Sequence, residues 1–202
     1  MSNIRFQTDY ITVNHEQRPL NKIQSIKYSL SKKEIDKFFN LIKDVKLEEG
    51  MTGPNQNQGK LNDSVRRSKL YWIPRNKEFY WLYKKIVDLM IDTNKTMWKF
   101  EITGVDILMQ YTEYDESYRG YYDWHTDIGN TNNSKRKLSA SIQLSDINDY
   151  EGGDLKFFNK VKANKEIGSM TIFPSYLLHK VEPVTKGKRK CLILWLTGPA
   201  FK

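Results

Sequence analysis

Apolar side chains in the first hundred residues recur at the spacing of two amphipathic helices. Ser31 and Glu34 form the Ser-x-x-Glu pattern of a capping box, so a helix should begin at about Ser31. Apolar residues then follow along one helical face, at Ile35, Phe38, Phe39 and Ile42. A second helix is expected from Asn76 to about Asn94, because apolar residues there again lie three and four positions apart.

After Trp98 the pattern changes to short apolar or alternating runs separated by turn residues. The six runs are EITGVDILMQY, YYDWHTD, KLSASIQLS, DLKFF, SMTIFP and CLILWLTG. Earlier strands are expected within residues 22–30 and in the tract RRSKLYWI, which begins at Arg66. Helices that come first and strands that come last indicate an α+β protein. The expected fold is a double-stranded β-helix, or jelly roll, buttressed by N-terminal helices.

The length of 202 residues predicts a single domain over residues 1–202, with helical support over about 1–97 and the jelly-roll core over about 98–202. No apolar run approaches the roughly 20 residues that a membrane-spanning helix needs. The N-terminal sequence MSNIRFQTDY lacks the apolar stretch of a signal peptide, and the single cysteine, Cys191, cannot form an internal disulfide. We therefore expect a cytoplasmic protein without a membrane partner.

The net charge of +9 could indicate an anionic partner such as nucleic acid. However, the lysines are spread along the whole chain and alternate with acidic residues, as on an ordinary solvated surface. Charge alone therefore does not favour nucleic-acid binding.

Residues 48–64 form the most polar stretch of the chain and are rich in glycine and asparagine. This composition predicts a mobile loop. The loop is either a plain surface loop or a lid that closes over a pocket.

The segment YYDWHTD carries a pattern typical of a metal site. His125 and Asp127 are two residues apart, and residues at this spacing on a strand face the same side. A distant strand could bring His179 to the same point. Two histidines and one carboxylate on one face of an ion leave three coordination positions open, as in the facial triad of non-haem iron(II) oxygenases.

Arg189 lies ten residues after His179 and opens the last apolar strand. Arginine suits two-pronged recognition of a carboxylate, and a buried arginine is costly unless it is paired. Because this strand offers no obvious acid, an anionic ligand would explain the residue. Lys188 and Arg136 are the next candidates for the same role.

Together these residues resemble the 2-oxoglutarate/Fe(II) oxygenases, in particular their prolyl 4-hydroxylase-like branch. The similarity covers roughly residues 65–198 and is strongest in the tail HKVEPVTKGKRKCLILWLTG, residues 179–198. Other matching elements are Arg66-x-Ser68, Gln110, Tyr114, Tyr122, Arg136 with the strand after it, and EGGDLKFF, residues 151–158.

The resemblance implies that the cofactors are Fe(II), 2-oxoglutarate and O2, with ascorbate as an accessory reductant. It assigns the metal ligands, which are also the catalytic residues, to His125, Asp127 and His179. It further implies that Arg189 binds the far carboxylate of 2-oxoglutarate with help from Gln143, and that Tyr114 donates a hydrogen bond to the cosubstrate.

Two departures from the family pattern affect these assignments. The stretch from Tyr114 to His125 is about two residues longer than in the family, so Tyr111 remains an alternative to Tyr114. Gln143 stands where some relatives have a tyrosine that contacts the cosubstrate. The residues expected to face the substrate are Arg66, Tyr122 and Trp195.

The function that the resemblance implies is hydroxylation of a C–H bond, with prolyl hydroxylation of a protein or peptide as the leading reaction. One alternative is a hydroxylase of a free amino acid or another small molecule. A second is a nucleic-acid demethylase of the AlkB type, against which Cys191 and Trp195 argue, because that family has Asn and Arg at these positions. A third is a non-enzymatic, cupin-like binding module.

Overall fold

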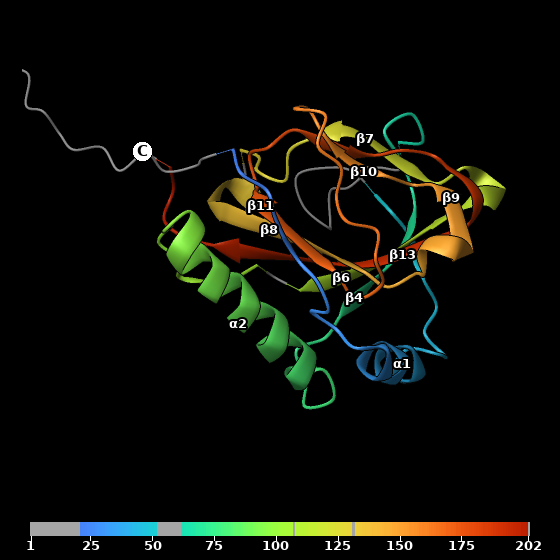
Figure 1. The fold of residues 1–202 in the computed structure, drawn as a ribbon, viewed down its shortest axis with the longest axis horizontal. Coiled ribbons are helices and arrows are strands. Elements are labelled where there is room, and N and C mark those ends of the chain that lie inside the picture. Colours follow the sequence, from blue (N-terminus) through green and yellow to red (C-terminus); the bar gives the residue numbers. More distant parts are fainter. Residues whose placement is uncertain (1–20, 52–61, 107, 131, 202) are drawn as a thin grey trace, which may run out of the picture.

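The computed structural model describes residues 21–51, 62–106, 108–130 and 132–201. Two antiparallel sheets face each other, and both helices lie against the outer face of the larger sheet (Figure 1). The predicted α+β jelly roll with buttressing helices is therefore confirmed. Within the described ranges, no helix is long and apolar enough to cross a membrane.

The larger sheet has nine strands. Seven follow the order β1-β11-β8-β13-β6-β4-β2, while β5 and β9 pair separately with β13. The strands are β1 (Gln24–Ile26), β2 (Glu48–Glu49), β4 (Lys69–Ile73), β5 (Gly104–Val105), β6 (Met109–Asp115), β8 (Arg136–Gln143), β9 (Tyr150–Gly152), β11 (Met170–Pro174) and β13 (Val184–Thr197). The long strand β13 lies between β6 and β8 at the centre, so its inward side chains reach the middle of the jelly roll.

The smaller sheet has four strands in the order β10-β12-β7-β3. Their bounds are β3 (Arg66–Arg67), β7 (Tyr121–His125), β10 (Leu155–Phe157) and β12 (His179–Val181). Three short 3-10 helices complete the fold, at η1 (Glu116–Tyr118), η2 (Asn132–Lys135) and η3 (Ile147–Asp149).

Alternation along the strands gives the larger sheet two different faces. On β8, Leu138 and Ile142 point toward the helices and join the main apolar core. On the opposite face of β8, Ser139 and Gln143 are buried between the two sheets. The space between the sheets is therefore lined partly by polar side chains, and a buried polar lining requires partners for its hydrogen-bonding groups.

Both predicted helices are present, with one shift in position. Helix α1 (Lys32–Leu41) begins after Ser31, whose side chain forms the predicted capping box with Glu34. Helix α2 (Tyr80–Met97) begins later than predicted, because the Asn76 side chain accepts bonds from the backbone N–H groups of Glu78 and Phe79 and holds a turn there.

The predicted strand RRSKLYWI is divided by Ser68 between the two sheets. Residues 66–67 form β3 in the smaller sheet, and residues 69–73 form β4 in the larger one. The Ser68 hydroxyl accepts a 2.6 Å bond from Nε of Arg66 at this crossing. The division places the Arg66 side chain in the interior between the sheets, where it is buried.

Two other predictions need correction or fall partly outside the structure. The strand expected within residues 22–30 covers only Gln24–Ile26, and a turn with Tyr28 at φ 55° follows it. The predicted loop over residues 48–64 begins as strand β2 rather than as a loop, since Glu48 and Glu49 pair with β4. Residues 52–61 of that loop, and with them most of the predicted lid, lie outside the described residues.

Candidate metal centre

Two histidines meet where strands β7 and β12 pair. His125 is the last residue of β7, His179 is the first residue of β12, and the antiparallel register places them opposite each other. Their ring centroids are 4.2 Å apart. Directly opposed side chains on neighbouring strands can reach a common point, and here that point lies between the sheets.

Asp127 reaches the same point by a route that differs from the prediction. Strand β7 ends at His125, so Asp127 is not on the strand and strand alternation does not place it. Instead its backbone N–H donates to the carbonyl oxygen of Ser175 at 2.9 Å, and its own carbonyl accepts a bond from Nη1 of Arg136 at 3.2 Å. These two bonds hold the bend that turns the carboxylate toward the histidines.

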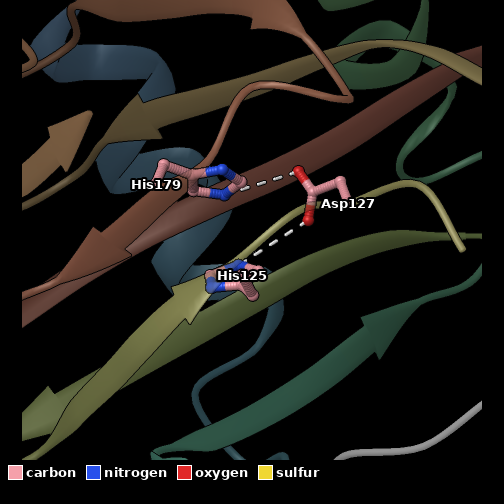
Figure 2. Close-up of side chains that lie close together, drawn as sticks. All are labelled: His125, Asp127 and His179. Atoms are coloured by element: carbon pink, nitrogen blue, oxygen red, sulfur yellow. Dashed lines mark ion pairs between the residues drawn. The ribbon is translucent and has the colours of Figure 1, made fainter. Parts of the chain in front are cut away.

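The three side chains have the spacing of a metal site. Figure 2 shows the carboxylate of Asp127 facing both imidazole rings from one side, with Oδ1 3.8 Å from Nε2 of His125 and Oδ2 3.7 Å from Nε2 of His179. One potential ligand atom from each residue lies within 4.8 Å of the others. Histidine nitrogens and carboxylate oxygens bind first-row ions such as zinc at about 2.0–2.2 Å, so one ion can bridge atoms about 4 Å apart.

Backbone carbonyls orient both imidazole rings. Nδ1 of His125 lies 2.7 Å from the carbonyl oxygen of Asp123, and Nδ1 of His179 lies 2.8 Å from that of Leu177. Since a carbonyl oxygen only accepts hydrogen bonds, each Nδ1 must carry the ring proton. Each Nε2 therefore presents a lone pair toward Asp127, as a metal ligand must.

The protonation states also suit a cation. Burial lowers the pKa of His125 to about 4, and the neighbouring His179 adds to this shift, so the ring is neutral at pH 7. Burial alone would raise the pKa of Asp127, but His179, His125 and Arg136 more than offset it and lower the pKa to about 2. A neutral imidazole beside an ionised carboxylate is the state in which these groups bind a metal ion.

A stack of side chains supports His125 from behind. The Tyr122 ring lies parallel to the His125 ring, with centroids 3.5 Å apart and an interplanar angle of 13°. The Arg66 guanidinium lies 4.8 Å from the centroid of Tyr122, and its Nη2 donates to Oε1 of Gln110 at 3.0 Å. Tyr122 and Arg66 thus both lie beside the centre, where Tyr122 contacts His125 and Arg66, and Arg66 also binds Gln110 and Ser68.

Arg189 lies in the same interior, but in the middle of its strand. Strand β13 begins at Val184, so Arg189 does not open it, and the side chain is only 4% exposed. Among the described residues no carboxylate pairs with Arg189, and its buried Nη1 has no hydrogen-bond partner. A buried guanidinium in this condition is costly, and an anionic ligand would relieve the cost.

The structure distinguishes between the two tyrosines considered for the cosubstrate. Tyr111 points to the helix side, where its ring packs against Phe38 and its hydroxyl donates to Glu113. Tyr114 points to the interior, and the Arg189 guanidinium lies 5.6 Å from its ring centroid. Burial raises the pKa of Tyr114, so its hydroxyl keeps its proton and can donate a hydrogen bond. Only Tyr114 shares the face of Arg189.

Gln143 is buried between the two sheets, as Arg189 is, but its side-chain N–H groups already donate hydrogen bonds within the protein. Nε2 donates to the carbonyl oxygen of Ser145 at 3.2 Å and to the hydroxyl of Tyr150 at 3.0 Å. Burial raises the pKa of Tyr150, and the positive charge of Arg189 partly opposes this rise. The described side-chain hydrogen bonds of Gln143 therefore go to Ser145 and Tyr150.

Lys188 and Arg136, the other candidates for binding the anionic ligand, form ion pairs with acidic residues. Lys188 forms ion pairs of 3.1 Å with Glu113 and with Asp115 and is 41% exposed, away from the interior. Arg136 is paired with Asp106 through a 2.6 Å bond from Nε. Its guanidinium also lies 3.9 Å from the ring centroid of Trp195, which is buried.

Three contributors to the site were not identified from the sequence. Tyr150 stands two residues before the Gly152-Gly153 pair, and its position beside that turn was the only available signal. Asp106 precedes β6 and pairs with Arg136 across thirty residues of sequence, so no local pattern marks it. Ser175 contributes a backbone carbonyl to Asp127, and no side-chain pattern can indicate that.

Comparison with known proteins identifies one family over the jelly-roll strands. Residues 109–197 match the family model described as the 2OG-Fe(II) oxygenase superfamily. A PKHD-type hydroxylase from Synechococcus sp. (strain CC9902) is 38% identical over 79 residues, which is 37% of this chain and 35% of that protein. One from Alteromonas mediterranea is 38% identical over 95 residues, or 43% of this chain and 41% of that protein. The chain thus matches less than half the length of these relatives.

Solved structures of prolyl hydroxylases share the fold. A Pseudomonas putida prolyl-4-hydroxylase has a TM-score of 0.67 at 15% identity, covering 89% of this chain and 94% of its own. A prolyl hydroxylase from Trichoplax adhaerens, in complex with a hypoxia inducible factor peptide fragment, has a TM-score of 0.70 at 21% identity, covering 88% and 84%. At these identities the similarity establishes the fold.

Proposed function

We propose that the chain is a 2-oxoglutarate- and Fe(II)-dependent prolyl hydroxylase of a protein or peptide, on the premise that residues 109–197 match the 2OG-Fe(II) oxygenase superfamily. The observation that carries the proposal is the convergence of His125, Asp127 and His179 in the interior that also holds the buried guanidinium of Arg189, whose Nη1 has no hydrogen-bond partner. The names of the relatives and structural neighbours support the choice of reaction.

The donor set fits iron(II). His125 and His179 would supply two imidazole nitrogens and Asp127 one carboxylate oxygen, a combination that leaves three positions of an octahedral ion open. When bound, iron(II) with 2-oxoglutarate and O2 supplies the oxidising power for C–H hydroxylation, and 2-oxoglutarate is converted to succinate and CO2. The carbonyls of Asp123 and Leu177 keep both imidazoles in the metal-binding tautomer throughout.

Arg189 would hold the far carboxylate of 2-oxoglutarate. Its Nη1 is buried without a partner, and guanidinium and carboxylate can form two parallel charge-assisted hydrogen bonds. The protonated hydroxyl of Tyr114 shares this face and would donate a further bond to the cosubstrate. Gln143 would contribute indirectly, through its bond to the hydroxyl of Tyr150.

Aromatic side chains shield the centre from water. The rings of Phe157 and Phe173 lie 5.9 and 4.7 Å from the His179 ring, between the two sheets. Exclusion of water strengthens every electrostatic contact in the site and limits side reactions. Tyr122, Trp195 and Arg66 lie around the same interior and are proposed to bound the space for the substrate residue.

The remaining assignments are the partner and the compartment. A polypeptide substrate is supported by the Trichoplax adhaerens neighbour, which was solved with a peptide fragment. A cytoplasmic location is supported by the single cysteine, Cys191, which is buried and unpaired. Ascorbate is proposed as the accessory reductant.

A peptide panel tests the proposed reaction. The protein would be incubated with Fe(II), 2-oxoglutarate, ascorbate and proline-containing peptides, together with free proline and other free amino acids. Mass spectrometry should show a gain of one oxygen atom on a prolyl residue, and succinate in equal amount. Oxidation of a free amino acid but of no peptide would transfer the assignment to small-molecule hydroxylation. Succinate formation that a prolyl compound raises above the peptide-free rate, without oxidation of that compound's proline, would refute prolyl hydroxylation.

A further inference from the structure

Exposed apolar side chains gather at one end of the smaller sheet. Among the described residues ten large hydrophobic side chains are exposed, and four of them lie here: Trp124, Phe158, Val161 and Leu178. The rings of Trp124 and Phe158 meet edge to face, with centroids 6.2 Å apart. The backbone N–H of Phe158 donates to the carbonyl of Leu178 at 3.0 Å. We call these four residues, with Lys160 and Lys180, the rim patch.

The rim patch adjoins the metal ligands directly. Trp124 precedes His125 on β7, and Leu178 precedes His179, so each is one residue step, about 3.8 Å, from a proposed ligand. Phe157, which precedes Phe158, is paired in register with His179. Trp124 is on strand β7, where neighbouring residues point to opposite faces, so it lies on the outer face where His125 points inward. The contacts of Phe158 with Trp124 and with Leu178 extend the patch from there. A polypeptide that reaches the metal at this end can continue across the patch.

The patch and its surroundings carry excess positive charge. Nζ of Lys180 lies 5.0 Å from the Trp124 ring centroid, and its nearest carboxylate, that of Glu182 at 3.7 Å, already binds Lys156 at 2.6 Å. Among the described residues no carboxylate pairs with Lys160, which is exposed in the turn after Phe158. This edge carries five lysines and only three carboxylates. The lysines are Lys156, Lys160, Lys162, Lys165 and Lys180, and the carboxylates are those of Asp123, Asp154 and Glu182.

We infer that the rim patch is a docking surface for the substrate polypeptide, and that the segment it binds carries an apolar side chain among acidic residues. The inference rests on the proposed function, because it takes a polypeptide to be the substrate. The aromatic pair would bind the apolar side chain, since exposed apolar clusters of this kind mark interaction sites. The lysines would select acidic neighbours, because complementary charge raises the association rate and excludes partners of the same sign.

Two synthetic peptides of equal length test the inference. Both contain one proline and one leucine, and they differ only in that glutamates in one replace lysines in the other. Fluorescence anisotropy would give their dissociation constants with the full chain loaded with Mn(II) and 2-oxoglutarate. The acidic peptide should bind at least tenfold more tightly than the basic one. Equal binding, or tighter binding of the basic peptide, would overturn the inference, as would a single-stranded RNA that competes for the patch more strongly than the acidic peptide.

Two variants and a matched control locate the binding. Phe158→Ala should raise the dissociation constant of the acidic peptide by about tenfold, because loss of an aromatic contact in an interface has an effect of this size. Lys160→Glu should weaken it by roughly threefold to tenfold at low salt and less at high salt. The control is Tyr80→Ala, which also removes an exposed ring, 64% exposed against 73% for Phe158, but from α2 on the far side of the larger sheet (Figure 1).

These results remain separable from a failure of the proposed reaction. Conversion of 2-oxoglutarate to succinate in the absence of peptide reports on the metal centre, and Phe158→Ala and Lys160→Glu should leave that conversion at the parent rate. If both variants bind the acidic peptide as tightly as the parent and the control do, the docking site is refuted even when succinate forms. If succinate never forms, the proposed reaction fails, whatever the peptides show.

Discussion

Replacement of Arg189 by lysine is expected to weaken 2-oxoglutarate binding without loss of the metal. The guanidinium is 4% exposed, has no carboxylate partner among the described residues and leaves Nη1 without a hydrogen bond. Lysine keeps the charge but cannot form two parallel bonds. Loss of one charge-assisted hydrogen bond costs about 1.5–3 kcal/mol. This corresponds to roughly ten- to a hundredfold in the dissociation constant. Arg189→Ala should cost more.

The assay is calorimetric titration of 2-oxoglutarate into the Mn(II)-loaded protein, with Mn(II) affinity measured separately. Lys188→Gln is a matched control, because it removes a positive charge from the residue before Arg189. The Lys188 side chain lies on the opposite face of β13 and binds Glu113 and Asp115. The control should bind 2-oxoglutarate as the parent does. Unchanged affinity in Arg189→Ala, or an equal loss in the control, would refute the assignment of Arg189 as the anchor.

The burial of Arg189 also leads to a prediction for the stability of the ligand-free protein. Replacement of a buried, incompletely paired charge by an apolar side chain of similar length is often neutral or stabilising. Arg189→Met should therefore leave the urea midpoint of the ligand-free protein unchanged or raise it, while 2-oxoglutarate should no longer stabilise the variant. A large loss of stability in the ligand-free variant would show that Arg189 has a structural partner.

Three further predictions concern the surroundings of the metal centre and the sheet edge. Asp127→Ala should abolish Mn(II) binding measured by calorimetry, whereas parent-like binding would exclude this carboxylate as a ligand. Tyr122→Leu should weaken Mn(II) binding by roughly fivefold through loss of the stack on His125, worth about 1 kcal/mol, and Tyr122→Phe should not; equal effects would refute the stacking role. Burial alone would raise the pKa of Asp154, but its partners Lys162 and Lys165 lower it by more than burial raises it, so the net shift is downward. The stabilisation from this carboxylate should therefore be present above its ordinary pKa of about 3.9 and be lost as the pH falls through the lower folded value. Asp154→Asn should reduce the urea midpoint at pH 7, and the difference from the parent should disappear in strong acid; a difference that is constant with pH would contradict the sign.

Local patterns predicted the parts of this molecule that depend on local interactions. The capping box at Ser31 and Glu34 involves residues three apart, and both of its hydrogen bonds are present. The alternating runs after Trp98 correspond to strands because each strand buries at least one face. The three proposed ligands could be selected because the chain has only three histidines, and only His125 has an aspartate two residues away.

The parts that the sequence could not give depend on contacts between distant segments. The register that places His179 opposite His125 joins residues 54 positions apart. Asp127 is held by a backbone carbonyl, that of Ser175, which no residue pattern records. The choice between Tyr111 and Tyr114 required knowing which face of β6 points to the helices, because both faces of that strand are buried.

Succinate production is the most direct test of the central claim. Purified protein would be supplied with Fe(II), 2-oxoglutarate, ascorbate and the proline peptide panel, in air and under nitrogen, and succinate would be measured by mass spectrometry. The account predicts succinate from the parent in air only, and none above background from Asp127→Ala, whose missing carboxylate leaves the two imidazoles without their third partner. Succinate from Asp127→Ala at the parent rate, or none from a folded parent that binds Fe(II) and 2-oxoglutarate, would contradict it.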